Sequence, residues 1–406
     1  MRFTKIFSSK INWKQFAPAL VIVLNSFIWY SLTQIMFSNA INSLEVSGTE
    51  RLILFTVYYV GTACSAILGP RLFRRALEPC LALWMLAGIV MTALLTTVPS
   101  NGTRLNIPIS FSLGVSVGIG LPSCLAYFAD TTVVESRGTC GGITWGAAGI
   151  GILALASLLG QFDLYTTFLV LATWRALGLG VFSLMAMRAG KIQRPRNPAS
   201  YDSILHKRDV MLYLTPWIML SLVNFTETPI LEKVFGDFYF LVGFIEFALI
   251  GIFALVGGIL ADFVGRKRVI ITGFVMLGIG YAVLGLFSGM PISWYLYTTC
   301  DGIAWGMFSS VFLITLWGDL AADREKEKYY VLGGLPFLLA GFLAIIIEPY
   351  VDFIGSATAF SLASFFLFLA VLPLMYAPET LPEKEIRDRE LKDYMERAKK
   401  VKERYT

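Results

Sequence analysis

The chain has 406 residues, of which 56% are hydrophobic and only 15% are charged. Soluble domains carry about 25% charged residues, so this composition excludes a water-soluble fold and indicates an integral membrane protein. The net charge is +5, and the five cysteines are scattered without a CxxC pair, so the sequence indicates neither a disulfide framework nor a zinc site.

Twelve apolar segments follow one another along the chain. A helix needs about 20 apolar residues to cross the hydrocarbon core, and a single segment in lipid can satisfy its backbone only as a helix. The first segment is longer than the core of a signal peptide, and we interpret it as a retained span. The predicted spans are residues 17–44, 51–69, 78–98, 107–129, 139–160, 164–187, 210–232, 238–261, 267–288, 292–317, 330–351 and 356–377.

The basic residues predict the orientation of these spans. Cytoplasmic loops of membrane proteins carry an excess of Lys and Arg. With the N-terminus inside, all but four of the 33 basic residues fall in cytoplasmic segments; Arg51, Arg104 and Lys233 lie in outer loops and Arg175 lies within the sixth span. The pattern predicts a multi-pass protein of the cell membrane with both termini in the cytoplasm.

The chain divides into two related halves. We predict an N-terminal six-helix bundle over 1–188, a cytoplasmic linker over 189–209, a C-terminal six-helix bundle over 210–377 and a charged tail helix over 378–406. The segment ILGPRLFRRAL at 67–77 aligns without gaps with ILADFVGRKRV at 259–269, each at the end of the second span of its half. Two repeated six-helix bundles are typical of one class of alternating-access transporters, so the predicted fold is all-α and pseudo-symmetric.

The turn between the eighth and ninth spans carries a specific motif. Residues 258–268, GILADFVGRKR, resemble the G-x-x-x-D-x-x-G-R-[KR]-[KR] loop signature of the major facilitator superfamily. Residues 127–138 are similar to the Y-x-x-[DE]-x6-R-G element of its sugar-porter branch, and residues 378–380 to the P-E-T element of that branch. Asp319, followed seven residues later by Lys326, is a looser second-half counterpart.

The resemblance implies a charge network on the cytoplasmic side, which we expect to stabilise the outward-open state. In the first half, Pro70 and Phe73 replace the aspartate and glycine of the loop signature, so only its two arginines remain. The glutamine-rich signature that sugar porters carry in the seventh span is also missing. The implied gating residues are Asp262, Gly265, Arg266, Asp319, Asp130, Arg137, Arg74, Arg75 and Glu379.

Ionisable residues inside the spans are the first candidates for binding a solute or an ion, because each costs at least about 2.5 kcal/mol at the centre of an isolated helix. Asp301 and Glu246 lie about 15 and 14 Å inside the outer ends of their spans, at similar depth. Asp301 is favoured because the fourth span of each half faces the central cavity in the family that the chain resembles; a buried structural acid is the alternative. Glu227 lies nearer an outer helix end, where it could simply reach water. Arg175 lies within the sixth span, and we expect it to form a structural ion pair.

Uncharged polar residues with neighbouring aromatic residues suit a neutral or hydroxylated solute. In the first span these are Asn25, Trp29 and Gln34, and in the seventh Asn224. The alternative for each is a hydrogen bond that ties two helices together.

The sequence predicts a transporter rather than an enzyme, because it has one histidine, in a loop, and no nucleophile motif. We expect no catalytic residue, cofactor or metal. The favoured function is secondary active or facilitative transport of a small solute, a sugar or another small organic metabolite, by alternating access, with proton coupling left open. Drug or organic-ion efflux by proton antiport is one alternative, and a non-transporting sensor with the same fold is another. The expected partners are the solute, protons where coupled, and membrane lipids, without nucleic acid, and the protein is predicted to be a monomer.

Overall fold

A computed structural model describes residues 11–73, 76–189, 199–322, 324–382 and 395. All twelve predicted spans are confirmed as helices, so the chain is an integral, multi-pass membrane protein. Arg74 and Arg75 and nearly all of the predicted tail helix lie outside the described residues. The observed spans are Trp13–Asn42, Gly48–Leu72, Leu77–Ser100, Thr103–Thr131, Val134–Leu159, Leu164–Ala189, Arg208–Phe235, Phe238–Val264, Arg266–Phe287, Pro291–Ala321, Glu327–Phe353 and Ser356–Tyr376.

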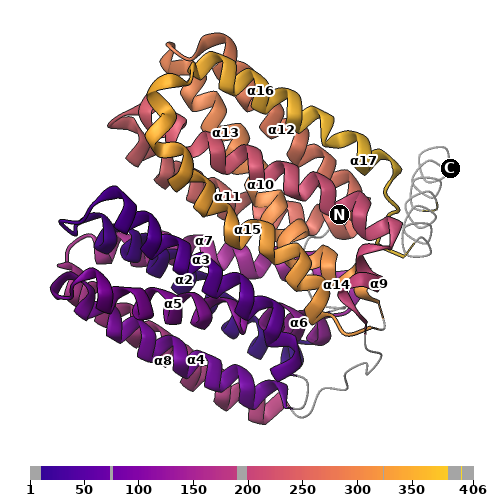
Figure 1. Ribbon diagram of the computed structural model, residues 1–406. Coiled ribbons are helices and arrows are strands. Elements are labelled where there is room, and N and C mark those ends of the chain that lie inside the picture. The colour runs from indigo at the N-terminus through magenta and orange to yellow at the C-terminus, as the bar shows by residue number, and fades with distance from the viewer. Residues whose placement is uncertain (1–10, 74–75, 190–198, 323, 383–394, 396–406) are drawn as a thin grey trace.

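The spans of the first half group together, below and to the left of those of the second half in Figure 1. Their helices are α2 (Trp13–Asn42), α3 (Gly48–Leu72), α4 (Leu77–Leu94), α5 (Thr103–Gly118), α6 (Leu121–Thr131), α7 (Arg137–Leu159) and α8 (Leu164–Ala189). The short helix α9 (Tyr201–Leu205) lies between the two groups in sequence and packs against α10.

The second half continues with α10 (Arg208–Phe235), α11 (Phe238–Val264), α12 (Arg266–Phe287), α13 (Pro291–Met307), α14 (Leu316–Ala321), α15 (Glu327–Ile347), α16 (Ser356–Leu369) and α17 (Val371–Tyr376). A π-helical stretch, Phe308–Thr315, joins α13 to α14 within one span. Such stretches are rare and are frequently found at functional sites.

The two halves pack most closely where α7 meets α11. A Cβ atom added to Gly258 would lie 2.2 Å from the carbonyl oxygen of Gly138, and one added to Gly142 would lie 2.6 Å from that of Ala254. Glycine is therefore required for the backbones to approach this closely. A second contact between the halves joins α3 to α15, where the rings of Tyr59 and Phe342 are 5.2 Å apart.

Candidate functional site

A carboxylate from the second half caps a helix of the first half at the end of the molecule that carries the loop motif. Asp262, on the last turn of α11, accepts hydrogen bonds from the backbone N–H groups of Gly138 (3.0 Å) and Thr139 (2.7 Å) and from the Thr139 hydroxyl (2.6 Å). Those residues form the first turn of α7, whose free N–H groups and helix dipole favour a negative charge. Gly138 is also the position at which a Cβ would collide with Asp262.

Two ion pairs cross between the halves in a reciprocal manner. Arg137 of the first half pairs with Asp319 of the second, and Lys326 of the second pairs with Asp130 of the first (2.5 Å). The motif pair Asp130 and Arg137 and its looser repeat Asp319 and Lys326 therefore exchange partners. Among the described residues, these are the ion pairs that connect the two halves.

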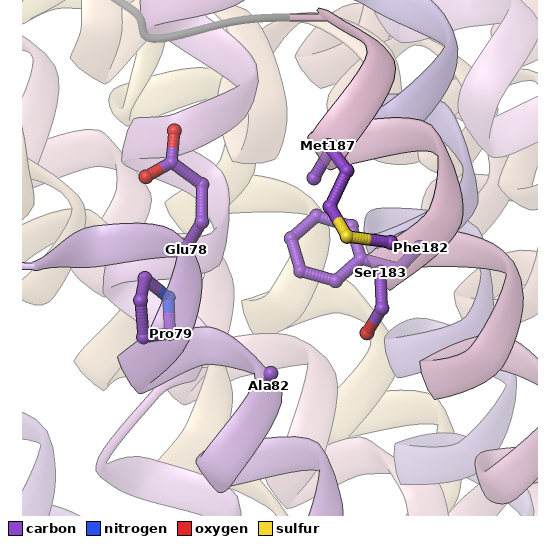
Figure 2. A pocket seen from close by; sticks show the side chains of 7 residues that line it. Glu78, Pro79, Ala82, Phe182, Ser183 and Met187 are labelled. Carbon is purple, nitrogen blue, oxygen red and sulfur yellow. The ribbon is translucent and has the colours of Figure 1, made fainter.

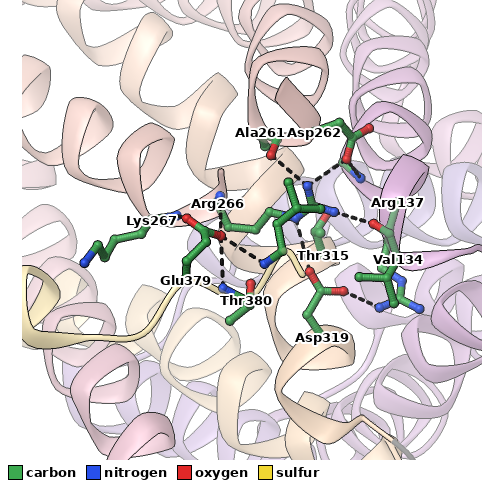
Figure 3. Close-up of polar contacts among 12 residues, drawn as sticks. Val134, Arg137, Ala261, Asp262, Arg266, Lys267, Thr315, Asp319, Glu379 and Thr380 are labelled. Carbon is green, nitrogen blue, oxygen red and sulfur yellow. Dashed lines mark hydrogen bonds and ion pairs between the residues drawn. The ribbon is translucent and has the colours of Figure 1, made fainter. Parts of the chain in front are cut away.

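Arg266 connects this exchange to the Asp262 cap, as Figure 3 shows. Its fully buried guanidinium pairs with Asp262 (2.8 Å) and Asp319 (3.2 Å), and it donates to the Val134 carbonyl of the first half (2.6 Å). Removing one partner from such a buried network is costly because it leaves another charge unpaired.

Glu379 completes the network from the segment that follows the last span. Its carboxylate accepts from the backbone N–H groups of Arg266 (2.8 Å) and Lys267 (3.1 Å) and so caps the start of α12. Gly265, with a φ of +100°, makes the turn, and a Cβ there would lie 2.3 Å from a Glu379 oxygen. The structure thus brings together all the implied gating residues that it describes.

The intramembrane acids of the second half meet one another. Asp301 on α13 is 3% exposed, and its carboxyl lies close to that of Glu246 on α11. Two ionised carboxylates side by side in the membrane interior would repel each other, so this arrangement favours a proton on one of the two groups. The Tyr297 hydroxyl lies 3.5 Å from Asp301 and 3.4 Å from the Tyr281 hydroxyl.

Glu227 does not extend into water at its helix end, because it is buried with 7% exposure. Its neighbour on α10, Asn224, accepts a hydrogen bond from the Trp305 indole at 3.3 Å. Asn224 is therefore on the side of α10 that meets α13.

The two polar candidates of α2 nearest its start point into the first bundle. Asn25 donates to the Trp174 carbonyl (2.8 Å), and the Trp29 indole donates to Thr92 (2.7 Å). Both therefore tie helices of one bundle together in this conformation. Gln34, nearer the outer end of α2, donates to the Tyr59 hydroxyl (3.0 Å), beside Gly341 of the second half.

Arg175 does not form the predicted ion pair among the described residues. Its guanidinium lies between the rings of Trp29 and Trp84, at 4.4 and 4.5 Å from their centroids, and it is fully buried. It donates to Asn25 Oδ1 (3.0 Å) and Ser26 Oγ (2.8 Å). Cation–π stacking and neutral acceptors thus take the place of an acid.

Aromatic rings from both halves meet between the two bundles, and sequence reasoning missed this grouping. Phe337 on α15 lies within ring contact of Tyr30 (6.3 Å) from the first half and of Phe225 (6.4 Å) and Trp305 (6.3 Å) from the second. The available signal was the aromatic content of 14%, which does not identify the rings that face one another.

A cleft of about 330 Å³ lies between α4 and α8 of the first bundle, as Figure 2 shows. Its walls are mostly apolar apart from Glu78 and Ser183, and it contains none of the predicted site residues. Within the described part of the chain, no group of three or more His, Cys, Asp or Glu side chains could hold a metal ion.

Comparison with known proteins gives one sequence relative and a structural neighbour. No protein-family model matches the chain. The chain is similar to the structure of the MFS (major facilitator superfamily) proton:xylose symporter XylE bound to 6-bromo-6-deoxy-D-glucose, with a TM-score of 0.68 and 15% identity, covering 90% of this chain and 96% of that chain. It is 30% identical over 146 residues to the enterobactin exporter EntS of Shigella boydii serotype 18 (strain CDC 3083-94 / BS512). That match covers 35% of this chain and only 35% of the length of the exporter.

Proposed function

We propose that this chain, which has the fold of the major facilitator superfamily, transports a small solute across the membrane by alternating access. The observation that carries the proposal is the reciprocal exchange of ion pairs between the halves, Arg137 with Asp319 and Lys326 with Asp130, at one end of the molecule. We call these two ion pairs the latch. Because the latch joins the bundles at one end only, the two bundles can rock about a site between them.

The latch holds the cytoplasmic side closed, so the conformation supports outward access. Asp262 and Arg266 strengthen it, because both bond to the first half as well as to each other. The gating charges thus act as one network, and a change of about 1.4 kcal/mol in its stability changes the ratio of the two conformations tenfold.

We propose that protons drive this exchange of conformations through Asp301 and Glu246. Loss of the shared proton leaves two negative charges in contact inside the membrane, which is unfavourable. Any conformation that separates the two carboxyls, or opens them to water, is then favoured. Proton occupancy and conformation are linked in this way.

The solute is proposed to be a sugar or another small organic metabolite that contacts the aromatic rings and the uncharged groups Gln34 and Asn224 between the halves. Rings and amides suit hydroxylated solutes. The structural neighbour named a proton:xylose symporter is consistent with this choice. Export of an organic compound is the second candidate, and the partial match to an exporter favours it.

The remaining properties are proposals of the same kind. The chain is expected to act as a monomer in the cell membrane, with both termini in the cytoplasm, in contact with lipids and without nucleic acid. It is expected to catalyse no chemical reaction and to need no cofactor, since the proteins that it resembles are named as transporters.

Reconstituted proteoliposomes test the function. Uptake and export of a panel of sugars, small metabolites and organic ions are measured with and without an imposed proton gradient. Accumulation that requires the gradient supports coupled transport, whereas gradient-independent equilibration supports facilitated transport. Binding of a solute without flux in either direction contradicts transport and identifies a sensor.

A further inference from the structure

The second span of each half ends differently, although the two ends align in sequence. In the second half, Asp262 at the end of α11 caps the start of α7, the fifth span of the other half. In the aligned segment of the first half, Pro70 stands at the position of Asp262. A proline has neither a carboxylate nor a backbone N–H group with which to bond to the other half. The equivalent junction, between the end of α3 and the start of α15, therefore lacks the bond that Asp262 supplies at α7.

The short helix α9 lies at this junction and is held to the second half by two lysines. Lys328, in the first turn of α15, donates to the Ala199 carbonyl (2.5 Å), and its ammonium lies 5.5 Å from the centre of the Tyr201 ring. At the other end of α9, Lys207 donates to the Tyr329 hydroxyl and lies 5.1 Å from the centre of that ring. Charge-assisted hydrogen bonds and cation–π contacts both stabilise the arrangement, so α9 is attached to the start of α15 at both of its ends.

A single side chain attaches α9 to the first half. The Tyr201 hydroxyl donates to the carbonyl oxygen of Ile67 on α3 (3.0 Å). Among the hydrogen bonds of the described residues, this is the one that joins residues 199–207 to the first half. Ile67 and Pro70 are one helical turn apart, so the bond is made next to the position where the aspartate is missing.

We propose that Tyr201 is a positioning residue that takes the place of the missing aspartate and, through α9, holds the end of α3 against the start of α15. The connection lies beside the latch, because Lys326 of the latch precedes Lys328 by two residues. The proposal rests on the proposed function in taking this end of the molecule to open during transport.

The Tyr201–Ile67 bond is the part of this connection that opening breaks. It joins two neutral groups, whereas the bonds that hold α9 to α15 come from lysine ammonium groups. Charge-assisted hydrogen bonds are about twice as strong as neutral ones. When the halves separate at this end, α9 therefore stays with the second half and leaves α3.

Labelling of Cys140 tests the proposal without any solute. Cys140 is 1% exposed on the first turn of α7, so a maleimide reaches it when the halves separate at this end. In a chain that keeps only this cysteine, purified in lipid, Tyr201→Phe should label about fivefold faster, the change in population that one ordinary hydrogen bond gives. The phenylalanine keeps the ring that Lys328 contacts, so the variant removes the hydroxyl alone. Tyr165→Phe, which changes an exposed tyrosine at the start of α8, should label at the wild-type rate.

Rescue by a carboxylate separates a positioning role from a general loss of packing. In the Tyr201→Phe chain, Pro70→Asp restores the residue of the loop signature and should return the labelling rate toward that of the wild type. Pro70→Ala, which supplies no carboxylate, should leave the rate high. Wild-type labelling of Tyr201→Phe would overturn the connection through α9. Equal rates in the Pro70→Asp and Pro70→Ala chains would overturn the assignment of Tyr201 to the place of the aspartate. These readouts need no flux, so a failed transport assay and a failed labelling assay remain distinguishable.

Discussion

The two bundles place opposite charges in their membrane interiors and stabilise them by different means. In the first bundle, Arg175 is held by two indole rings and by the oxygens of an amide and an alcohol, none of which is an acidic group. In the second, Asp301 lies close to the Glu246 carboxyl and the Tyr297 phenol, both of which are acidic groups. The charge of the first interior is therefore fixed, whereas that of the second would vary with its proton load under the proposed proton coupling.

This difference assigns separate tasks to the two halves. A conformational equilibrium can respond to protons only where protonation changes the energy of one state relative to the other. The second bundle has such groups at mid-depth, and its α11 also carries Asp262, which bonds to the first half at the start of α7. We therefore infer that proton loading acts through the second bundle, against a first bundle of constant charge.

The largest effect on transport is expected from neutralising Asp301, in the interior of the second bundle. Asp301→Asn should abolish accumulation driven by a proton gradient while sparing exchange of solute across the membrane, because the amide cannot release a proton. Parallel assays of gradient-driven uptake and counterflow in proteoliposomes measure the two activities. The matched control is Glu348→Gln, which changes an exposed carboxyl just beyond the end of α15. Accumulation that survives Asp301→Asn would show that coupling lies elsewhere.

The next effect concerns the latch between the halves. Asp319→Asn removes the carboxylate that pairs with Arg137 and leaves Arg266 with Asp262 alone, and breaking a buried ion pair in this way costs about 3–5 kcal/mol. We expect the cytoplasmic side to open more often. Cys140, which is 1% exposed on the first turn of α7, is a native reporter of that opening.

In a chain that retains only this cysteine, maleimide labelling of Cys140 should be at least tenfold faster in Asp319→Asn, as about 1.4 kcal/mol in favour of the open state suffices for that change. Asp352→Asn removes the exposed ion pair with Lys233 at the outer side and should leave the labelling rate unaltered. Equal rates in the two variants would contradict the latch.

Sequence reasoning predicted the fold well because membrane spans are determined by composition and length. All twelve helices follow from apolar runs that lipid forces into helical structure. The partners of the gating charges could not be predicted in the same way: the loop motif identified Asp262 and Arg266, but the α7 cap and the exchange between Arg137 and Asp319 depend on how the halves dock.

The polar residues of α2 show the same limit at the candidate site. Asn25 and Trp29 are one turn apart, and periodicity cannot tell which side of α2 faces the other half. Their contacts with Trp174 and Thr92 are set by the packing of α8 and α4. The acid pair was predicted only as two residues of similar depth; that they touch depends on the approach of α11 to α13, where Gly302 and Gly306 allow close contact.

The smallest effect on transport is expected from substituting Arg175, the buried charge of the first bundle. Arg175→Met should retain proton-driven accumulation, because the methionine fills apolar space between the tryptophans and removes a charge that has no acidic partner among the described residues. Arg175→Lys should be the less stable variant. It keeps the charge but loses the planar stacking on two rings, worth about 0.5–2 kcal/mol for each cation–π contact.

Thermal unfolding of the two purified variants in the same lipid and detergent mixture measures their stability, and gradient-driven uptake measures coupling. The expected order of melting temperature is methionine above lysine, with coupling retained in the methionine variant. Lost coupling in Arg175→Met, at unchanged melting temperature, would mean that the first bundle also responds to the proton gradient. In that case the division between a fixed and a varying interior would fail, and Arg175 would belong to the transport pathway rather than to the packing of α2 against α8.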